Sequence, residues 1–302
     1  MTRFVGIDLA WGPTARTGVA VLDEAGCLVH SSSVVTDEEL DAVVRTHTAG
    51  APVVSAIDAP LVVPNLTGMR PAERLVTQHF GRYAAGAYPA NRSNRHFDPP
   101  RGERLAQRHG WTVDPDVRPD AHTSVAIEVY PHPAMVVLFG LERVIPYKSK
   151  PGRDLESRSA AWRVLLDHLE RVAGPLLGLA SNARWQHLRD AAVQATRPVD
   201  LDRIEDEVDA IVCAHLAWLW ATERDRMVVL GTVEDGYIVV PGLPTPPAPR
   251  RPARAAAPVG LDGTEVRHRR AVEAVLVEMP SLTRDAAERL VRVVAAELSS
   301  SP

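Results

Sequence analysis

The sequence contains few of the residues that build cross-linked or zinc-stabilised proteins. Only two cysteines occur, Cys27 and Cys213, and no CxxC pair is present. This scarcity excludes a cysteine zinc site and argues against a disulfide framework. We therefore expect a protein of the reducing cytoplasm.

Long apolar runs are also missing. The longest, residues 210–221, includes His215 and is too short to cross a bilayer. The first residues lead directly into a strand. They lack the basic stretch followed by an apolar stretch that is typical of a signal peptide. We therefore expect a protein that is not exported and has no membrane partner. His215, inside this apolar helix, is predicted to be a core histidine.

Several catalytic motifs are absent. The chain has no Walker motif, no GxGxxG loop, no GxSxG elbow and no HExxH helix. These absences argue against P-loop nucleotide binding, serine acyl transfer and HExxH zinc hydrolysis. The chain has 34 basic and 38 acidic residues and a net charge of −4. This total indicates no class of binding partner, whereas the distribution of the charges along the chain does.

The pattern of apolar residues predicts an α/β protein. Thr36 and Glu39 form a capping box, which predicts the start of the first helix. The other helices are expected after Pro71 and at 101–110, 134–141, 154–172, 183–195 and 200–222, and the strands within 3–12 and at 17–22, 27–35, 52–57, 123–130, 227–233 and 237–240.

Composition divides the chain into three parts. We expect a main domain over residues 1–243, with an irregular insert at about 61–122. Residues 244–260 are rich in proline, alanine and arginine and are typical of a semi-rigid linker. Residues 261–302 are predicted to form a helical hairpin, which would serve for docking or for homodimerisation.

Acidic residues interrupt three apolar strands. Asp8 lies at the inner end of the first strand, Asp58 directly follows the strand at 52–57, and Glu128 lies within the strand at 123–130. An ionised carboxylate among apolar residues costs several kcal/mol unless it is paired, hydrogen-bonded or bound to a cation. Each of these acids therefore needs a partner, although Asp8 alone could also be a simple turn residue.

A further pair of acids is expected on the long helix at 200–222. Asp209 begins a stripe that continues through Cys213, Leu216 and Trp220, which is a buried face at 100° per residue. Asp206 lies one turn earlier on nearly the same side, and Glu205 is its alternative. Which of these three acids joins a site is left open by the spacing.

Acids gathered from several elements, without cysteine, predict a site made only of oxygen ligands. Such a site suits Mg²⁺ or Mn²⁺ rather than zinc. Two such ions about 3.5–4 Å apart can activate a water molecule and stabilise the leaving oxygen of a phosphodiester. We therefore treat Asp8, Asp58, Glu128, Asp206 and Asp209 as candidate catalytic residues.

The insert is basic although the whole chain is acidic. Between Arg70 and Arg108, eight arginines stand against three acids, with tyrosine and phenylalanine interleaved. This composition is typical of a surface that meets phosphates and bases, and the alternative is a solvated loop. The candidate nucleic-acid contacts, with one lysine from a later loop, are Arg70, Arg92, Arg95, Arg101 and Lys148.

Five motifs carry a resemblance to a known family. In chain order they are GIDLAWG, AIDAPL, IEVYPHP, EDEVDAIVCAHLA and GYIVVP. Together they resemble uncharacterised prokaryotic proteins described as predicted RNase H-like nucleases, over residues 2–242. The resemblance implies an RNase H-like fold, with a mixed five-stranded sheet flanked by helices. It also implies metal ligands at Asp8, Asp58 and Asp209, supported by Glu128 and Asp206, and leaves residues from 243 onwards outside.

Two other functions remain open. GIDLAWG is also similar to the opening motif of sugar kinases, actin and the heat-shock ATPases, which bind ATP. Those proteins need a second glycine-rich phosphate loop, and the matching place here, AIDAPL, has no glycine until Gly68. The second alternative is a binding or scaffold protein that keeps the fold without catalysis.

Overall fold

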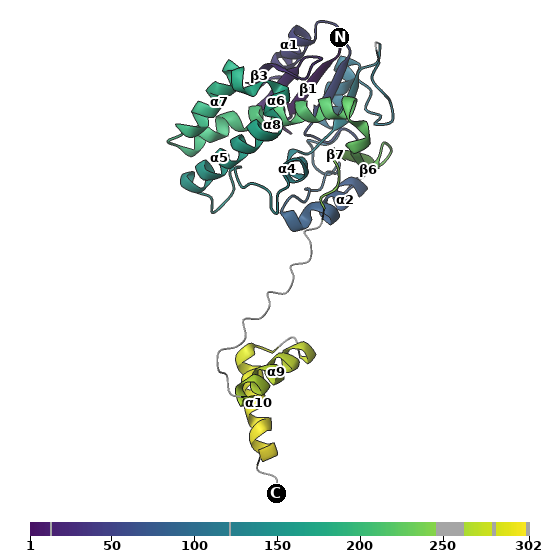
Figure 1. Cartoon of the computed structure of the whole chain (residues 1–302). Coiled ribbons are helices and arrows are strands. Elements are labelled where there is room, and N and C mark those ends of the chain that lie inside the picture. Colours follow the sequence, from purple (N-terminus) through teal and green to yellow (C-terminus); the bar gives the residue numbers. More distant parts are fainter. Residues whose placement is uncertain (13, 121, 246–262, 280–281, 300–302) are drawn as a thin grey trace. The chain divides into compact units, whose positions relative to one another are not determined.

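A computed structural model describes residues 1–12, 14–120, 122–245, 263–279 and 282–299. It confirms an α/β architecture with a five-stranded mixed sheet flanked by helices (Figure 1). The strand order is β3-β2-β1-β4-β5. β1 pairs antiparallel with β2 and parallel with β4, and β4 pairs parallel with β5. A separate hairpin is formed by β6 and β7.

The strands are β1 Arg3–Asp8, β2 Thr17–Leu22, β3 Leu28–Val34, β4 Val53–Ile57, β5 Val125–Glu128, β6 Val228–Thr232 and β7 Gly236–Val240. The helices of the same part of the chain are α1 Asp37–Thr48, α2 Pro71–Phe80, α3 Arg101–His109, α4 Pro131–Phe139, α5 Leu155–Val172, α6 Gly174–Leu177, α7 Ala183–Val193 and α8 Pro198–Thr222. Short 3-10 turns follow at η1 Gly81–Tyr83, η2 Leu179–Ser181 and η3 Arg224–Arg226.

The capping box predicted before the first helix is confirmed. The Thr36 hydroxyl accepts a hydrogen bond from the Glu39 backbone N–H at 3.1 Å, and the Glu39 carboxylate accepts one from the Thr36 N–H, also at 3.1 Å. These two bonds satisfy donors that the first helical turn leaves without partners. α1 therefore begins where the sequence predicts.

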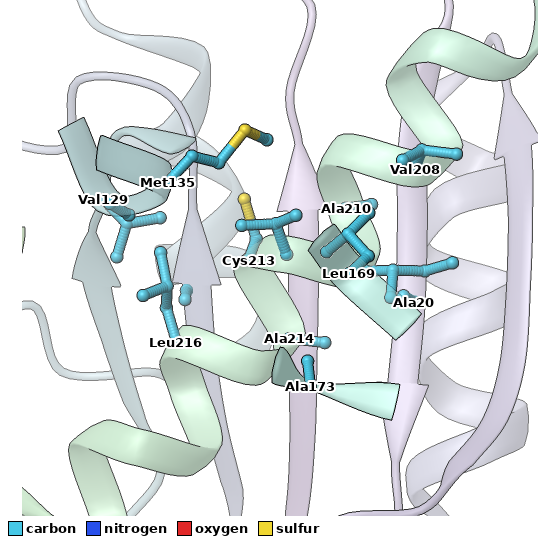
Figure 2. Packing of buried hydrophobic residues seen from close by; sticks show 14 of the residues in the cluster. Ala20, Val129, Met135, Leu169, Ala173, Val208, Ala210, Cys213, Ala214 and Leu216 are labelled. Carbon is cyan, nitrogen blue, oxygen red and sulfur yellow. The ribbon is translucent and has the colours of Figure 1, made fainter. Parts of the chain in front are cut away.

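Helix α8 is the centre of the larger core. It packs directly against β1, β2 and β4, and α5 and α7 cover it from outside (Figure 1). In Figure 2 its side chains Val208, Cys213 and Leu216 lie among residues of the sheet and of α4 and α5. The predicted buried stripe is confirmed, because Asp209, Cys213, Leu216 and Trp220 are at most 2% exposed. His215 is 7% exposed, as a core histidine should be.

The opposite face of the sheet has its own core. Val5 and Ile7 of β1 pack there with Leu40 and Val44 of α1. The alternation of side chains along a strand explains this division, since neighbouring residues point to opposite faces. Phe4, which belongs to the core around α8, therefore shares its face with Gly6 and Asp8.

Some boundaries differ from the predicted ones. β5 covers only residues 125–128 of the strand expected at 123–130. α4 begins at Pro131, earlier than the expected 134, because proline fits the first helical turn and lacks only an N–H that would have no helical partner there. α6 was not predicted. Most of the linker expected at 244–260 lies outside the described residues.

The chain divides into two compact units, residues 1–246 and 247–302. The second contains α9 Gly263–Glu278 and α10 Arg284–Ser299, which contact each other. Arg284 and Glu273 form an ion pair of 2.7 Å between these helices. A role of this hairpin in dimerisation stays a prediction. Among the helices of the described residues, none has the length and apolar character needed to cross a membrane.

Candidate functional site

The ends of β1 and β4 bring Asp8 and Asp58 together. The two strands are parallel neighbours, with Ile7 opposite Ile57. The Asp58 backbone N–H donates to the Ile7 carbonyl at 2.8 Å. Both acids therefore stand at the same edge of the sheet, at the carboxyl ends of adjacent strands. Gly6 lies two residues before Asp8, and Ala56 lies two residues before Asp58; both face α8. Because side chains alternate along a strand, the two acids are on the α8 side of the sheet as well.

Two glycines let α8 approach this edge closely. A Cβ added to Gly6 would lie 2.0 Å from the Ala214 backbone nitrogen, and one added to Gly18 would lie 1.8 Å from the Asp206 carbonyl oxygen. Gly18 is the β2 partner of Asp8 in the sheet. Because only glycine has no Cβ, these positions allow the backbone of α8 to rest on β1 and β2. The result is that Asp206 lies beside Asp8.

A cavity of about 590 Å³ opens at this edge. Its wall includes three partly exposed carboxylates, those of Asp8, Asp58 and Asp206, and the ammonium groups of Lys148 and Lys150. Glu205, the other candidate at the start of α8, is not part of the wall and lies 3.9 Å from Lys148 Nζ through its Oε1. Of the acids left open by the helix spacing, Asp206 is thus the one that reaches the cavity.

Asp209 lies beneath the cavity rather than on its wall. Its side chain is 0% exposed. Oδ1 accepts a hydrogen bond of 2.6 Å from the Tyr147 hydroxyl, and Oδ2 is 2.6 Å from Lys148 Nζ. Asp209 therefore holds the ammonium group of Lys148 at the cluster, and its two oxygens already have partners. As a metal ligand it would have to exchange one of them.

The carboxylates on the cavity wall resist ionisation. Burial, reinforced by the charges of Asp58, Asp209 and Asp206 and opposed by Lys148, raises the pKa of Asp8 well above its usual value. Burial and the charge of Asp209, opposed by Lys148, raise the pKa of Asp58 to about 7 and that of Asp206 to about 6. Each of these carboxylates is thus costly to ionise, because it is buried and lies near other acids.

The pKa of Lys148 is raised as well, which for an amine favours the charged form. Burial alone would lower it, but the negative charges of Asp209, Asp8 and Asp58 and the neighbouring Tyr147 outweigh burial and raise the pKa well above its usual value. The ammonium form is therefore favoured at neutral pH. Lys148 acts as a permanent positive charge in the cluster.

Glu128 lines the same cavity but is paired with an arginine. Its carboxylate is 3% exposed and faces Arg70, with Arg70 Nη2 at 2.5 Å from Oε1 and Nη1 at 3.0 Å from Oε2. Oε2 also accepts the Leu61 backbone N–H at 2.9 Å. Glu128 pairs with Ile57 in the sheet and so points away from the face of α8. Its partners make it a structural residue of the wall.

Two of the predicted nucleic-acid contacts are buried and paired with carboxylates. Arg70 is 1% exposed and donates to Glu73, Glu128 and the Val62 carbonyl. Arg101 is 4% exposed and pairs with Asp37 at 2.6 Å. A buried guanidinium group is costly unless it is paired and hydrogen-bonded, and both arginines meet this requirement. Both guanidinium groups are thus already paired with carboxylates of the chain.

The other basic candidates remain at the surface or at the cavity. Arg92 is exposed and pairs with Asp98 at 2.5 Å. Arg95 is exposed, and it forms no ion pair with the described part of the chain. Lys148 is on the cavity wall, 24% exposed through its side chain.

Sequence reasoning missed the aromatic part of the cavity. Trp11, Tyr88, Tyr130 and His132 line the same space as the acids. Burial, with the charge of Lys148 as the next cause, lowers the pKa of His132 to about 3, so its imidazole is neutral at physiological pH. The Tyr130 hydroxyl lies 3.4 Å from His132 Nδ1. The YPHP segment directly after β5 was the available signal, because polar side chains at a strand end belong to the same edge as Asp58.

The fold and the site define an α/β protein with a carboxylate-lined cavity at the carboxyl ends of its parallel strands. The chain belongs to the family described as "Protein of unknown function (DUF429)", whose model matches residues 6–234. This range contains Asp8, Asp58, Asp206 and Lys148 and ends before the C-terminal hairpin. No match was found among curated proteins or among solved structures.

Proposed function

We propose that this protein is a divalent-metal-dependent phosphodiesterase that cleaves nucleic acid, on a fold of the RNase H-like type. The observation that carries the proposal is the meeting of Asp8, Asp58 and Asp206 on one wall of a 590 Å³ cavity, with Lys148 as the neighbouring cation. The order of strands, with an antiparallel meander followed by two parallel strands, is what the family resemblance leads us to expect.

The donor groups fit Mg²⁺ or Mn²⁺. All three are carboxylates, the ligands that hard divalent cations prefer. The pKa of Asp8 is raised first by burial and then by the neighbouring carboxylates, so its ionised form is costly here, and a bound divalent cation would offset that cost. Within the described ranges no three acidic, histidine or cysteine side chains are arranged to hold a metal ion. Binding therefore requires the carboxylates of Asp8, Asp58 and Asp206 to turn toward a shared point.

The residues of the chain would divide the work as follows. A bound divalent ion supplies the positive charge that activates a water molecule and stabilises the leaving oxygen. Asp8, Asp58 and Asp206 hold that charge in place. Lys148, kept in position by Asp209 at 2.6 Å, neutralises a non-bridging phosphate oxygen. The neutral imidazole of His132 is available as a hydrogen-bonding group beside the phosphate.

Cleavage assays test the proposal. Single-stranded DNA, RNA, duplex and branched substrates are incubated with the protein in Mg²⁺, in Mn²⁺ and in EDTA. We expect metal-dependent cleavage by the wild type and its loss in Asp8→Asn, by a factor of at least 100. Asp235→Asn, an exposed residue between β6 and β7, is the matched control and should cleave like the wild type.

Two outcomes would overturn the proposal. One is the absence of cleavage of every substrate by the wild type in either metal. The other is identical activity of the wild type and Asp8→Asn, which would place any cleavage outside this cavity. Hydrolysis of ATP without cleavage of nucleic acid would instead favour the ATP-binding alternative.

A further inference from the structure

Trp11 is an exposed aromatic side chain on a loop whose backbone is held by hydrogen bonds. It lies three residues after Asp8, lines the cavity and is 46% exposed. The buried guanidinium of Arg101 holds the backbone on both sides of it, with Nη1 at 2.8 Å from the Ala10 carbonyl oxygen and 3.3 Å from that of Gly12. The buried guanidinium group of Arg101 thus fixes the backbone around Trp11, while the side chain of Trp11 remains exposed to solvent.

The ring of Trp11 is also fixed from one side. It packs edge to face on Phe97, with ring centroids 5.0 Å apart and an interplanar angle of 67°. Phe97 is 2% exposed. A large apolar ring that is held by a buried ring and a buried arginine, yet stays half exposed, loses little conformational freedom when a ligand covers it. These features are those of a preorganised binding surface.

A second exposed ring lies on the same cavity. Tyr88 is 64% exposed. Lys150 Nζ lies 3.4 Å from its hydroxyl and 5.8 Å from its ring centroid. Lys150 also lines the cavity. An aromatic face next to a cation is the combination that binds a base and its phosphate in single-stranded nucleic acids.

The volume of the cavity agrees with one nucleotide. The cavity volume of about 590 Å³ is within the range of roughly 300–1,000 Å³ for small-ligand sites. Apolar residues such as Ala90 and Ile238 line part of it, and Lys148 and Lys150 supply positive charge. A base stacked within a duplex presents only its edges, so its face cannot stack on Trp11.

We propose that the cavity binds a nucleotide whose base is unpaired, with the base stacked on Trp11 and with Tyr88 and Lys150 extending the contact. This inference rests on the proposed function only in taking nucleic acid as the ligand. It makes single strands, or nucleotides turned out of a duplex, the substrate class of the site. Arg101 is then a positioning residue for Trp11.

Binding measured without cleavage tests this inference. A short dye-labelled oligonucleotide is titrated with the full-length protein in EDTA and low salt, and its fluorescence anisotropy is recorded. We compare the wild type with Trp11→Ala, Trp11→Phe, Tyr88→Ala and the control Leu66→Ala. Leu66 is 70% exposed and does not line the cavity. The same oligonucleotide is measured with one base removed and as a fully paired duplex.

We expect Trp11→Ala to weaken binding of the single strand by roughly 5- to 100-fold, as the loss of one stacking contact does. Trp11→Phe should keep most of the affinity, and Leu66→Ala all of it. Removing the stacked base should weaken binding to the wild type but not to Trp11→Ala. The duplex should bind more weakly than the single strand.

Equal affinity of the wild type and Trp11→Ala would overturn the inference, as would equal affinity for duplex and single strand or no binding of either. A nucleoside monophosphate is added as a competitor to identify the source of the nucleotide. If the mononucleotide competes with an affinity similar to that of the oligonucleotide, the ligand of the site is a free nucleotide. If it competes only weakly, the ligand is a nucleotide within a strand. The proposed function fails separately, since binding that depends on Trp11 without metal-dependent cleavage would leave this site standing.

Discussion

The substitution Asp58→Asn is expected to stabilise the metal-free protein at neutral and higher pH. The Asp58 carboxylate ends a strand beside Asp8, and burial is the main reason why the pKa of Asp58 rises to about 7. Ionising this group in the folded state therefore costs free energy that the unfolded chain does not need. Asparagine keeps the shape of the side chain and removes the charge.

The size and sign of the effect follow from the pKa. A rise from 3.8 to about 7 corresponds to an upper limit of about 4 kcal/mol at 1.36 kcal/mol per unit. The folded state binds this proton more tightly, so the stability of the wild type falls as pH rises from about 4 to about 7. Asp58→Asn lacks this fall. The pKa of about 7 already contains the opposing attraction to Lys148, so we expect a gain of up to about 4 kcal/mol above pH 7 and almost none below pH 4.

Urea unfolding in EDTA at several pH values measures this difference, with the exposed Asp235→Asn as the control. Adding Mg²⁺ or Mn²⁺ should then stabilise the wild type and leave Asp58→Asn almost unchanged, because ligand binding to the folded state adds stability. A difference between wild type and Asp58→Asn that is the same at low and high pH would refute the electrostatic account of the site.

Three further predictions concern the surroundings of the cluster. Glu128→Gln removes the charge of one of the two buried carboxylate partners of Arg70 and should lower stability by up to about 3 kcal/mol in urea unfolding, while calorimetry should find the metal affinity unchanged. Gly18→Ala forces a Cβ to within 1.8 Å of the Asp206 carbonyl oxygen and should destabilise by about 1–3 kcal/mol or more, whereas Gly174→Ala, with no neighbour nearer than 3.6 Å, should have little effect. Arg95→Glu should weaken nucleic-acid binding and lower its salt slope by about 1–2, more than Arg92→Glu does, and an unchanged slope would leave Arg95 as solvated surface.

Local patterns were sufficient to predict the elements that carry the site. The strand ending in Asp8, the strand ending before Asp58 and the capping box at Thr36 are all properties of short segments, and all are confirmed. The buried stripe that begins at Asp209 follows from helical periodicity alone.

The partners of long or buried side chains could not be predicted in the same way. Whether Arg70 meets solvent or Glu128 depends on how the insert returns to the sheet, which no local pattern contains. The direction of the Glu128 side chain could be predicted in part, since Val125 and Ile127 face α8 and alternation turns Glu128 to the other side. Asp209 was correctly expected to be buried, but its partners Tyr147 and Lys148 come from a loop that gives no periodic signal.

A crystal soaked in Mn²⁺ tests the central claim most directly. The account predicts an anomalous peak in contact with the carboxylates of Asp8, Asp58 and Asp206, and no peak at Glu128, whose oxygens are held by Arg70. The same soak of Asp8→Asn should lose the peak. A wild-type crystal without anomalous density at these three carboxylates, at a Mn²⁺ concentration that saturates exposed sites elsewhere, would contradict the account.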